Sequence, residues 1–539
     1  MSGETSHPIK AQVFARNATG LVRSWSAWTS FIYSFLITSV IGNGALLFAS
    51  FLGFGFFSGA DLPLSILITG LASIPMIFVY ASMGSAIPRA GGDYVWMSRI
   101  LGPGASFVLV TVANTVFLAG WVAAQGEIGS IFILPSALSI MGFGSAVSFL
   151  FTSSGQILVT FLLIVIPFAL ISTGMRTVGA FLKVAFATSI AGSIMIISLL
   201  SLAHNTFQSN YATAIGSNAY QNVISTATGA GFRSASFSLW STIVCLTFFT
   251  GMLGPVNNIA PHLGEVRGAS SLKKLFTLQF AAIALGTALT GTIFYLISYG
   301  FGSTFWGSLS YLFLIGKPTS SAPPFAPYFI FMSTYAAGKL RADVAVFLLI
   351  FVLIGQLYAN LLNALQPVKY LFAQSFDRLL PERISYVNAR TRSPLAALLV
   401  ILVGSIIWAV AGVINPNYTV FKLISANVLG YVVFIMGACL AGALFPYRLK
   451  TIFHSSESSR YRVGGLPLVT LAGAIGLVYL ATMIYIWATV PQLGVFATPA
   501  LTTVGEVYGL IIILYVILRV AQSYRKVPLS LTFKEIPPE

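Results

Sequence analysis

The stretch from Thr38 to Gly44 has the sequence Thr-Ser-Val-Ile-Gly-Asn-Gly and lies in the middle of the first hydrophobic segment of the chain. Apolar runs flank it, from Phe31 to Leu36 and from Ala45 to Phe57. Two glycines around an asparagine weaken a helix, and a membrane offers no water to the backbone groups that a broken helix leaves unpaired. Such a break is tolerated where those groups face a cavity or a ligand. The alternative is that the glycines only let a second helix pack closely.

Composition places the whole chain in a membrane. The 539 residues are 57% hydrophobic and 7% charged, and the mean hydropathy is +0.90, whereas a soluble domain carries about 25% charged residues. Cys245 and Cys439 both lie in apolar segments, so no disulfide framework is expected. The first 25 residues are polar and basic, which argues against a removable signal peptide.

Apolar runs long enough to cross a bilayer predict twelve membrane spans. Their approximate limits are 26–54, 63–87, 103–134, 156–173, 179–203, 238–262, 275–302, 342–366, 394–414, 421–445, 466–491 and 506–522.

The distribution of basic residues predicts the orientation. If both termini lie on one side of the membrane, 23 of the 28 Lys and Arg residues fall on that side, so both termini are expected in the cytoplasm. The expected location is the plasma membrane. Membrane topology and attraction to anionic lipids then explain the net charge of +16, so nucleic-acid binding is not needed to explain it. The hydrophilic segments 204–237 and 303–341 are expected outside, and composition does not decide whether 204–237 is an ordered cap or a flexible loop.

A second interrupted span is expected at the sixth position. Gly251, Gly254 and Pro255 fall within five residues there, which makes a continuous helix improbable. Breaks in the first and sixth of twelve helices are what two inverted five-helix repeats produce, with the substrate between them.

Three motifs give the chain a family resemblance. The break Ile41-Gly42-Asn43-Gly44, the turn Pro88-Arg89-Ala90-Gly91-Gly92-Asp93-Tyr94, and a segment with Lys369, Ala373, Asp377, Leu380-Pro381, Val387-Asn388 and Ser393-Pro394 stand in that order. Together they resemble the amino acid–polyamine–organocation (APC) superfamily over roughly residues 20–490. Gly264-Glu265-Val266-Arg267 is similar to the exit of the family's sixth helix but lacks its second acid, Asn and Pro.

The resemblance implies an all-α polytopic membrane protein with a LeuT-type fold and an amino-acid permease function. Two inverted five-helix repeats with broken helices 1 and 6 are followed by two peripheral helices. The expected divisions are a cytoplasmic tail at 1–25, the first repeat at 26–203, an extracellular loop at 204–237, the second repeat at 238–445, the last two helices at 446–522 and a cytoplasmic tail at 523–539.

The two breaks have the chemistry to bind an α-amino acid. A half-helix that begins near Gly42–Ala45 presents unpaired N–H groups to a carboxylate, and carbonyls freed near Ile37–Ser39 and Phe249–Gly251 accept hydrogen bonds from an ammonium group. Phe248 and Phe249 are gate candidates, with the alternative that each only faces lipid. The predicted substrate-binding residues are Ile41, Gly42, Asn43, Gly44, Ala45, Phe249, Thr250, Gly251, Gly254 and Asn257.

Polar residues inside spans are candidates for ion coupling or for interhelical bonding. Glu127 in the third span is a functional candidate because an acid within a membrane is costly, although it lies toward the outer end, where water could reach it. In proton-coupled members of the family a lysine follows the glycine at the start of helix 5 by fifteen residues. Counted from Gly174, that position here is Ser189. Span 8 contains no Ser or Thr for a sodium site, and for Gln356, Asn360 and Asn363 bonding between helices is favoured over the pathway.

These patterns favour a secondary active transporter with no cofactor and no metal, driven by protons, over an enzyme. The four histidines form no metal-ligand pattern, and the chain has no phosphate-binding GxxxxGK[ST] loop. A polyamine or organic-cation transporter and an uncoupled amino-acid exchanger remain open as alternatives. A channel would favour continuous pore helices, and a non-transporting sensor would more often carry a long soluble tail. The substrate, the oligomeric state and the coupling ion are not set by the sequence.

Overall fold

The computed structural model describes residues 23–42, 45–317, 319, 321–322, 328–388, 391, 393–414, 420–525 and 532–533. Among these, ten helical stretches are long and apolar enough to cross a membrane. They are α3 (Leu62–Ala86), the run from α5 to α7 (Pro103–Ile140), α9 (Ser153–Ser172), α10 (Met175–Ile215), the run from α14 to α15 (Leu272–Leu314), the run from α16 to α17 (Phe329–Phe376), α18 (Leu395–Ile414), α19 (Val420–Arg448), α21 (Leu468–Thr489) and α22 (Thr498–Tyr524).

Three of these runs contain internal changes of helix type. Their α-helical parts are α5 (Pro103–Thr111), α6 (Leu118–Ile128), α7 (Leu134–Ile140), α14 (Leu272–Ile297), α15 (Ser303–Leu314), α16 (Phe329–Met332) and α17 (Arg341–Phe376). Single π turns at Val112–Phe117, Gly129–Ile133 and Ser298–Gly302 join the first five of these, and a 3₁₀ stretch at Ser333–Leu340 joins the last two. An all-α polytopic membrane protein is therefore confirmed, whereas the count of twelve spans and the inverted repeats stay predictions.

The first and sixth predicted spans are the two that lack a long continuous helix. The first consists of α1 (Ala27–Thr38) and α2 (Ala45–Phe56), separated by a turn in which the Gly42 N–H bonds to the Ser39 carbonyl at 3.3 Å. The sixth consists of α12 (Leu239–Cys245), a 3₁₀ stretch at Leu246–Leu253, α13 (Gly254–Asn257) and a second 3₁₀ stretch at Ala260–Glu265. Asn43 and Gly44 lie outside the described residues.

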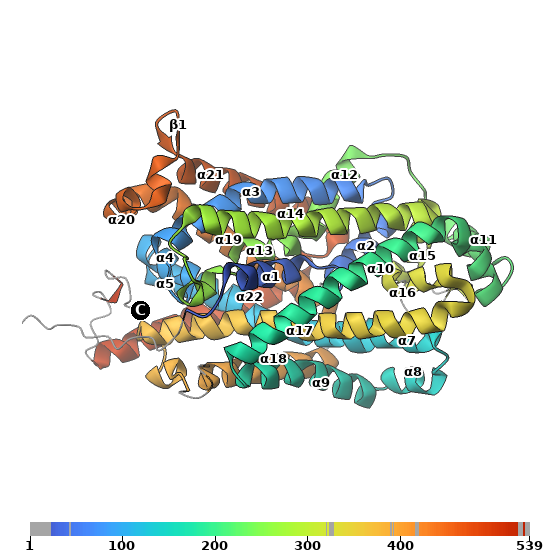
Figure 1. Ribbon diagram of the computed structural model, residues 1–539, viewed down its shortest axis with the longest axis horizontal. Coiled ribbons are helices and arrows are strands. Elements are labelled where there is room, and N and C mark those ends of the chain that lie inside the picture. The colour runs from blue at the N-terminus through green and yellow to red at the C-terminus, as the bar shows by residue number, and fades with distance from the viewer. Residues whose placement is uncertain are drawn as a thin grey trace, which may run out of the picture.

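The long helices run along the length of the molecule (Figure 1). α3 packs along α14, α19 along α21, and α1 lies against both α10 and α14. One end of the molecule, which we call the basic end, holds α4 (Gly92–Ile100), the start of α5 and α20 (Lys450–Ser455). The opposite end holds α8 (Gly144–Leu150) and α11 (Ala219–Gly229).

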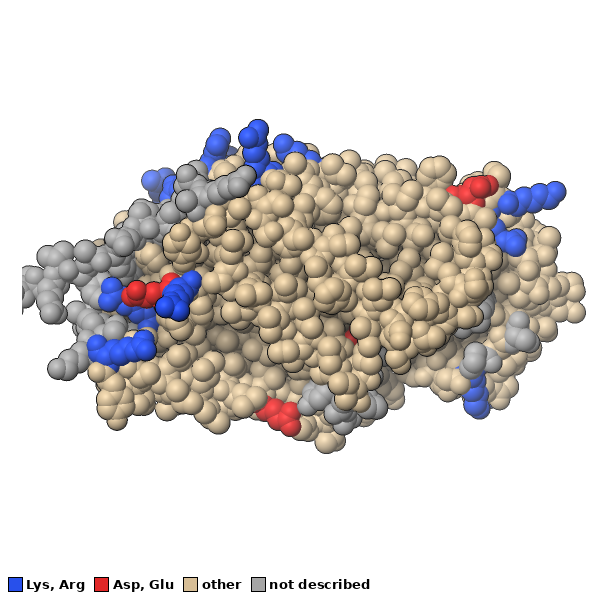
Figure 2. All heavy atoms as spheres, turned by 90° about the horizontal axis from the view of Figure 1, so that it is seen from below, with Lys and Arg blue, Asp and Glu red and all other residues tan. Residues whose placement is uncertain are grey.

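Charge and exposed apolar side chains divide the surface as a membrane requires. Figure 2 shows Lys and Arg gathered mainly toward the basic end and a wide uncharged face over the middle. Large apolar side chains are exposed on α10, α18 and α22, including Ile194, Ile407 and Ile513. Such a continuous exposed apolar surface fits a lipid-facing belt.

Several predicted loops and helix limits differ from the structure. α10 continues to Ile215 and α11 follows, so most of the described part of 204–237 is helical, and 303–341 includes α15 and α16. The helices are longer than the apolar segments predicted from the sequence. Helical hydrogen bonding continues beyond the bilayer, whereas hydropathy indicates only the part of a helix that lies within the membrane. The described strands, β1 (Arg462–Val463) and β2 (Leu466–Pro467), form a short hairpin whose turn has positive φ at Gly464 and Gly465.

The glycines of the Pro88–Tyr94 turn are required by close packing. Gly91 has φ +80° and Gly92 has φ +25°, a backbone region that favours glycine. A Cβ at Gly91 would lie 2.2 Å from the Cβ of Ala373, and one at Gly92 would lie 2.0 Å from the carbonyl oxygen of Ala260. The turn thus fixes the start of α4 between the end of the sixth span and the end of α17.

Candidate functional site

The interruption in the first span is held between α10 and α17. A Cβ at Gly355 of α17 would lie 2.5 Å from the Ile41 carbonyl oxygen, and one at Gly192 of α10 would lie 2.9 Å from Ile41 Cδ1. The ring of Tyr358 lies directly against Gly42, since a Cβ there would be 2.5 Å from Tyr358 Cε2. Ile41 therefore packs away from the centre, whereas Gly42 faces a cavity.

Side chains from other helices hold the backbone groups of this interruption. The Gln125 side-chain amide of α6 donates a hydrogen bond to the Gly42 carbonyl at 3.1 Å. The hydroxyls of Ser39 and Ser189 are hydrogen-bonded to each other, so position 189 of α10 does meet the first break. Ala45 begins α2, but its side chain is not described.

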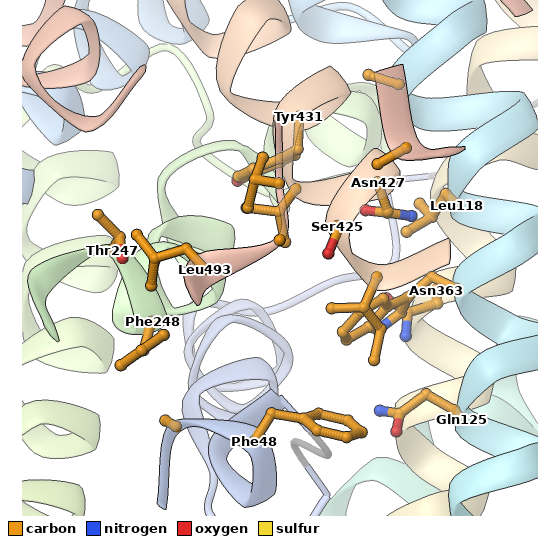
Figure 3. Close-up of a pocket in the computed structure, with 18 of the residues that line it drawn as sticks. Phe48, Leu118, Gln125, Thr247, Phe248, Asn363, Ser425, Asn427, Tyr431 and Leu493 are labelled. Carbon is orange, nitrogen blue, oxygen red and sulfur yellow. The ribbon is translucent and has the colours of Figure 1, made fainter. Parts of the chain in front are cut away.

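A cavity of about 380 Å³ lies between the two interruptions (Figure 3). Its size falls in the usual range for small-molecule sites, about 300–1,000 Å³. Residues of both breaks line it, together with parts of α6, α17, α19 and the connector from α21 to α22. The lining is Leu36, Ile37, Gly42, Phe48, Ala49, Leu52, Ala113, Asn114, Leu118, Trp121, Gln125, Thr247, Phe248, Asn258, Ala359, Asn363, Gln366, Ile424, Ser425, Asn427, Val428, Tyr431, Trp487, Leu493, Gly494, Val495, Ala497, Pro499 and Ala500.

The cavity is apolar, with a few uncharged polar groups. None of these described lining residues is Asp, Glu, Lys, Arg or His. Gln125 Oε1, Asn114 Nδ2 and Asn258 Nδ2 are buried and have no hydrogen-bond partner among the described residues. An acceptor and two donors are thus available to a ligand, because buried polar groups are normally paired.

The residues expected from the sixth span are divided between two environments. Phe248 lines the cavity, as Figure 3 shows. Phe249 is fully buried and turns instead to Phe294 of α14, with 5.6 Å between ring centroids. Asn257 lies behind the cavity wall, where its Oδ1 accepts a hydrogen bond of 2.9 Å from the Tyr431 hydroxyl. The side chain of Thr250 and the surroundings of Gly251 and Gly254 lie outside the described part.

Some polar residues of the third and eighth spans line the cavity, and others lie away from it. Glu127 is buried on α6 but does not line the cavity. Asn360 donates a hydrogen bond of 2.9 Å to the Leu163 carbonyl of α9, which is the expected bonding between helices. Asn363 lines the cavity instead. Its neighbour Gln366 also lines the cavity, and its side chain donates a hydrogen bond to Asn258.

Sequence reasoning missed the largest part of the cavity wall. Trp121, Tyr431 and Trp487 lie in ordinary apolar runs that carry no sign of a pocket. Leu493 belongs to the connector between α21 and α22, which was expected to be peripheral, yet it reaches the cavity close to Thr247 (Figure 3). Gly494, whose φ is positive in the structure, is a signal of a turn that the sequence does contain.

Below the cavity, the basic end is closed by buried ion pairs. Lys369 Nζ lies 2.6 Å from Glu265 Oε1, with both side chains almost fully buried. Arg99 forms a two-pronged pair with Asp377, at 2.8 and 3.0 Å. Burial alone would raise the pKa of Glu265, but the Lys369 ammonium and the His262 imidazole outweigh it and lower that pKa to about 2.

The start of α1 is attached to the same network. The Trp25 N–H donates to the Glu265 carbonyl at 2.9 Å, and the Arg267 N–H donates to the Trp25 carbonyl at 2.9 Å. The Trp25 ring stacks on His262, with 4.9 Å between centroids. The exit of the sixth span and the beginning of the first are therefore joined through backbone as well as side chains, and Lys369 ties both to α17.

In a comparison with known protein families, residues 24–518 match the family described as amino acid permease. No curated protein matches the chain. The matched region includes both interruptions, the cavity and the ion pairs of the basic end. The chain therefore belongs to the amino acid permease family of the APC superfamily.

Proposed function

We propose that the protein is a secondary active transporter that carries an amino acid with an uncharged, apolar side chain across the plasma membrane by alternating access. One observation carries the proposal: a cavity of about 380 Å³, without a charged side chain among its described lining residues, lies where the first and sixth spans are interrupted. The basic end faces the cytoplasm, with both termini on that side, because Lys and Arg are retained there.

The lining favours the class of substrate. The zwitterionic backbone of the amino acid meets the interrupted helices, where Gln125 Oε1 and the amides of Asn114 and Asn258 are unpaired. Its side chain meets Phe48, Trp121 and Leu493. A charged side chain would lose its hydration without gaining a counter-charge, which costs several kcal/mol.

The same lining disfavours the polyamine branch of the superfamily. A polyamine carries two or more ammonium groups and no carboxylate, so it needs acids in its site. No described residue of the cavity supplies one. We propose proton-coupled uptake, with uncoupled exchange as the second candidate, because span 8 has no Ser or Thr to help bind sodium at the first break. Ser189 stands at the helix 5 position where proton-coupled members carry a lysine, so the coupling proton binds to another group.

The test is uptake of labelled amino acids into proteoliposomes. Leucine and phenylalanine are expected to be taken up and to compete with each other, whereas lysine, glutamate and spermidine are expected to compete poorly. Equal competition by spermidine would support the polyamine alternative. Binding of leucine without any uptake or exchange would support a sensor instead.

Recognition of both ends of the amino acid gives a second expected outcome. The methyl ester and the N-acetyl derivative of the best substrate should each lose roughly 5- to 150-fold in affinity, because each leaves buried polar groups unpaired at about 1–3 kcal/mol. Competition against labelled substrate measures the loss, with the free amino acid as control. If both derivatives compete undiminished, the backbone of the substrate does not bind at the helix interruptions.

A further inference from the structure

Asp93 is a buried acid that lies outside the cavity and has no role in the proposed amino-acid site. It is the second residue of α4 and belongs to the Pro88–Tyr94 turn. Its side chain is completely buried, and no Lys, Arg or His among the described residues forms an ion pair with it. An ionised carboxylate buried without a cation is costly, so the closed conformation favours the protonated acid.

The groups that interact with the Asp93 side chain are uncharged and come from four helices around it. They are Tyr80 of α3, Asn257 of α13, Tyr370 of α17 and Tyr431 of α19. The Tyr94 N–H bonds to Asp93 Oδ1 at 3.2 Å, while no residue in the described part of the chain is hydrogen-bonded to Oδ2. The hydroxyls of Tyr80 and Tyr370 and Asn257 Nδ2 also lack partners among the described residues. Donors are therefore present that could stabilise the ionised acid after a small rearrangement.

Opposing influences bring the pKa of Asp93 into the physiological pH range. Burial is the largest influence and raises its pKa from 3.8, while Tyr370, the backbone N–H groups and Asn257 act to lower it. The result is a pKa of about 7. Asp93 lies outside the long apolar stretches, between the end of α3 and the start of α5.

A short chain of contacts joins Asp93 to the cavity. Tyr431 lines the cavity, and its hydroxyl donates the 2.9 Å hydrogen bond to Asn257 Oδ1. Asn257 is the last residue of α13, directly after the second interruption, and it faces Asp93. The Gly91 N–H bonds to the Pro261 carbonyl at 2.9 Å, so the turn that carries Asp93 is attached to the same segment. A rearrangement of the sixth span therefore changes the surroundings of Asp93.

We propose that Asp93 is the carboxyl group that binds the coupling proton, and that Tyr431 and Asn257 link its occupancy to the state of the substrate cavity. This inference rests on the proposed proton-coupled uptake. In the closed conformation the acid keeps its proton. When the basic end opens, the O–H bond of the carboxyl breaks, the proton passes to water on the cytoplasmic side, and the donors of Tyr370 and Asn257 stabilise the carboxylate. A proton from the other side restores the acid in the next cycle.

Asp93 fits this role better than Glu127. Both acids are buried, and neither of them lines the cavity. Asp93 is connected to the second interruption through Asn257. Glu127→Gln is therefore the matched comparison, because it also replaces a buried acid by its amide.

The experiment compares two transport assays in proteoliposomes for wild type, Asp93→Asn, Glu127→Gln and Asp343→Asn. The first assay is accumulation of labelled amino acid driven by an imposed pH gradient without sodium, and the second is exchange of labelled for unlabelled substrate without a gradient. Asp93→Asn should lower accumulation at least about tenfold relative to exchange, because the asparagine side chain is always uncharged and cannot bind or release a proton. Glu127→Gln and Asp343→Asn, an exposed acid on α17, should keep the wild-type ratio.

Each result bears on a different part of the proposal. If wild type does not accumulate substrate under the pH gradient, proton coupling fails and the role of Asp93 fails with it. If wild type accumulates and Asp93→Asn does so equally, only the assignment to Asp93 is overturned. Loss of accumulation in Glu127→Gln with an unaffected Asp93→Asn would move the proton site to Glu127.

A spectroscopic measurement keeps the inference testable if Asp93→Asn does not fold. Infrared difference spectra of the wild type, recorded on addition of substrate, should contain a band of a protonated carboxyl group. In Asp93→Glu this band should shift, and in Glu127→Gln it should remain unchanged. An identical band in wild type and Asp93→Glu, shifted or lost in Glu127→Gln, would contradict the assignment.

Discussion

Replacing Gly42 with leucine is expected to abolish amino-acid binding. Gly42 has the cavity on one side and the Tyr358 ring on the other, so close that even a Cβ would lie 2.6 Å from the tyrosine hydroxyl oxygen. A leucine side chain has two ways to fit, by displacing Tyr358 or by filling the cavity. Either removes the geometry in which the backbone of the substrate meets the interrupted helix. Gly42→Ala should weaken binding to a smaller extent, because it adds one carbon atom.

Thermal stabilisation by the best substrate measures the effect. Overpacking of this kind costs about 1–3 kcal/mol of folding stability, so the melting temperature without substrate is compared in the same experiment. Gly505→Leu is the matched control, since Gly505 is exposed on α22 and a Cβ there has no neighbour within 4 Å. Undiminished stabilisation of Gly42→Leu by the amino acid would place the binding site elsewhere.

The second large effect is expected from Lys369→Met. This change leaves Glu265 buried at the basic end without its cation, and removal of one partner of a buried pair typically costs about 3–5 kcal/mol. The melting temperature in detergent should fall accordingly. In the double variant Lys369→Met with Glu265→Gln, most of the loss should be recovered, because the uncompensated charge is gone. A single variant as stable as wild type would show that the pair contributes nothing.

The same pair predicts how stability depends on pH. The pKa of Glu265 is about 2 in the folded protein, below the value of about 4.3 for an unfolded chain. The unfolded state therefore binds the proton first as pH falls, and the stabilisation present above about pH 5 is lost between roughly pH 5 and 2. Melting temperatures across this range should show a smaller acid loss in the double variant than in wild type.

The broken helices were predictable because glycine and proline act on the backbone itself. Gly42 in the first span, and Gly254 with Pro255 in the sixth, interrupt helices in any surroundings, and the structure has its interruptions there. The paired glycines of the Pro88–Tyr94 turn gave a similar local signal. Such residues constrain φ and ψ, so their effect can be read without knowing what surrounds them.

The inner faces of the helices were not predictable in the same way. In a bilayer both the lipid-facing and the protein-facing sides of a helix are apolar, so hydropathy does not distinguish Phe248, which lines the cavity, from Phe249, which packs on Phe294. Asn363 lines the cavity, although bonding between helices was favoured for it from the sequence. The positions of these side chains depend on the rotation of whole helices within the bundle, which is set by long-range packing.

The connector that carries Leu493 and Gly494 into the cavity has an evolutionary consequence. Helix walls are constrained by their neighbours over many turns, so a change of residue in them disturbs packing on several sides. A short connector is freer to gain, lose or exchange residues. A change in the length of this connector would therefore change the substrate specificity of a homologue toward larger or smaller amino acids, while the sequence of the helices stays the same.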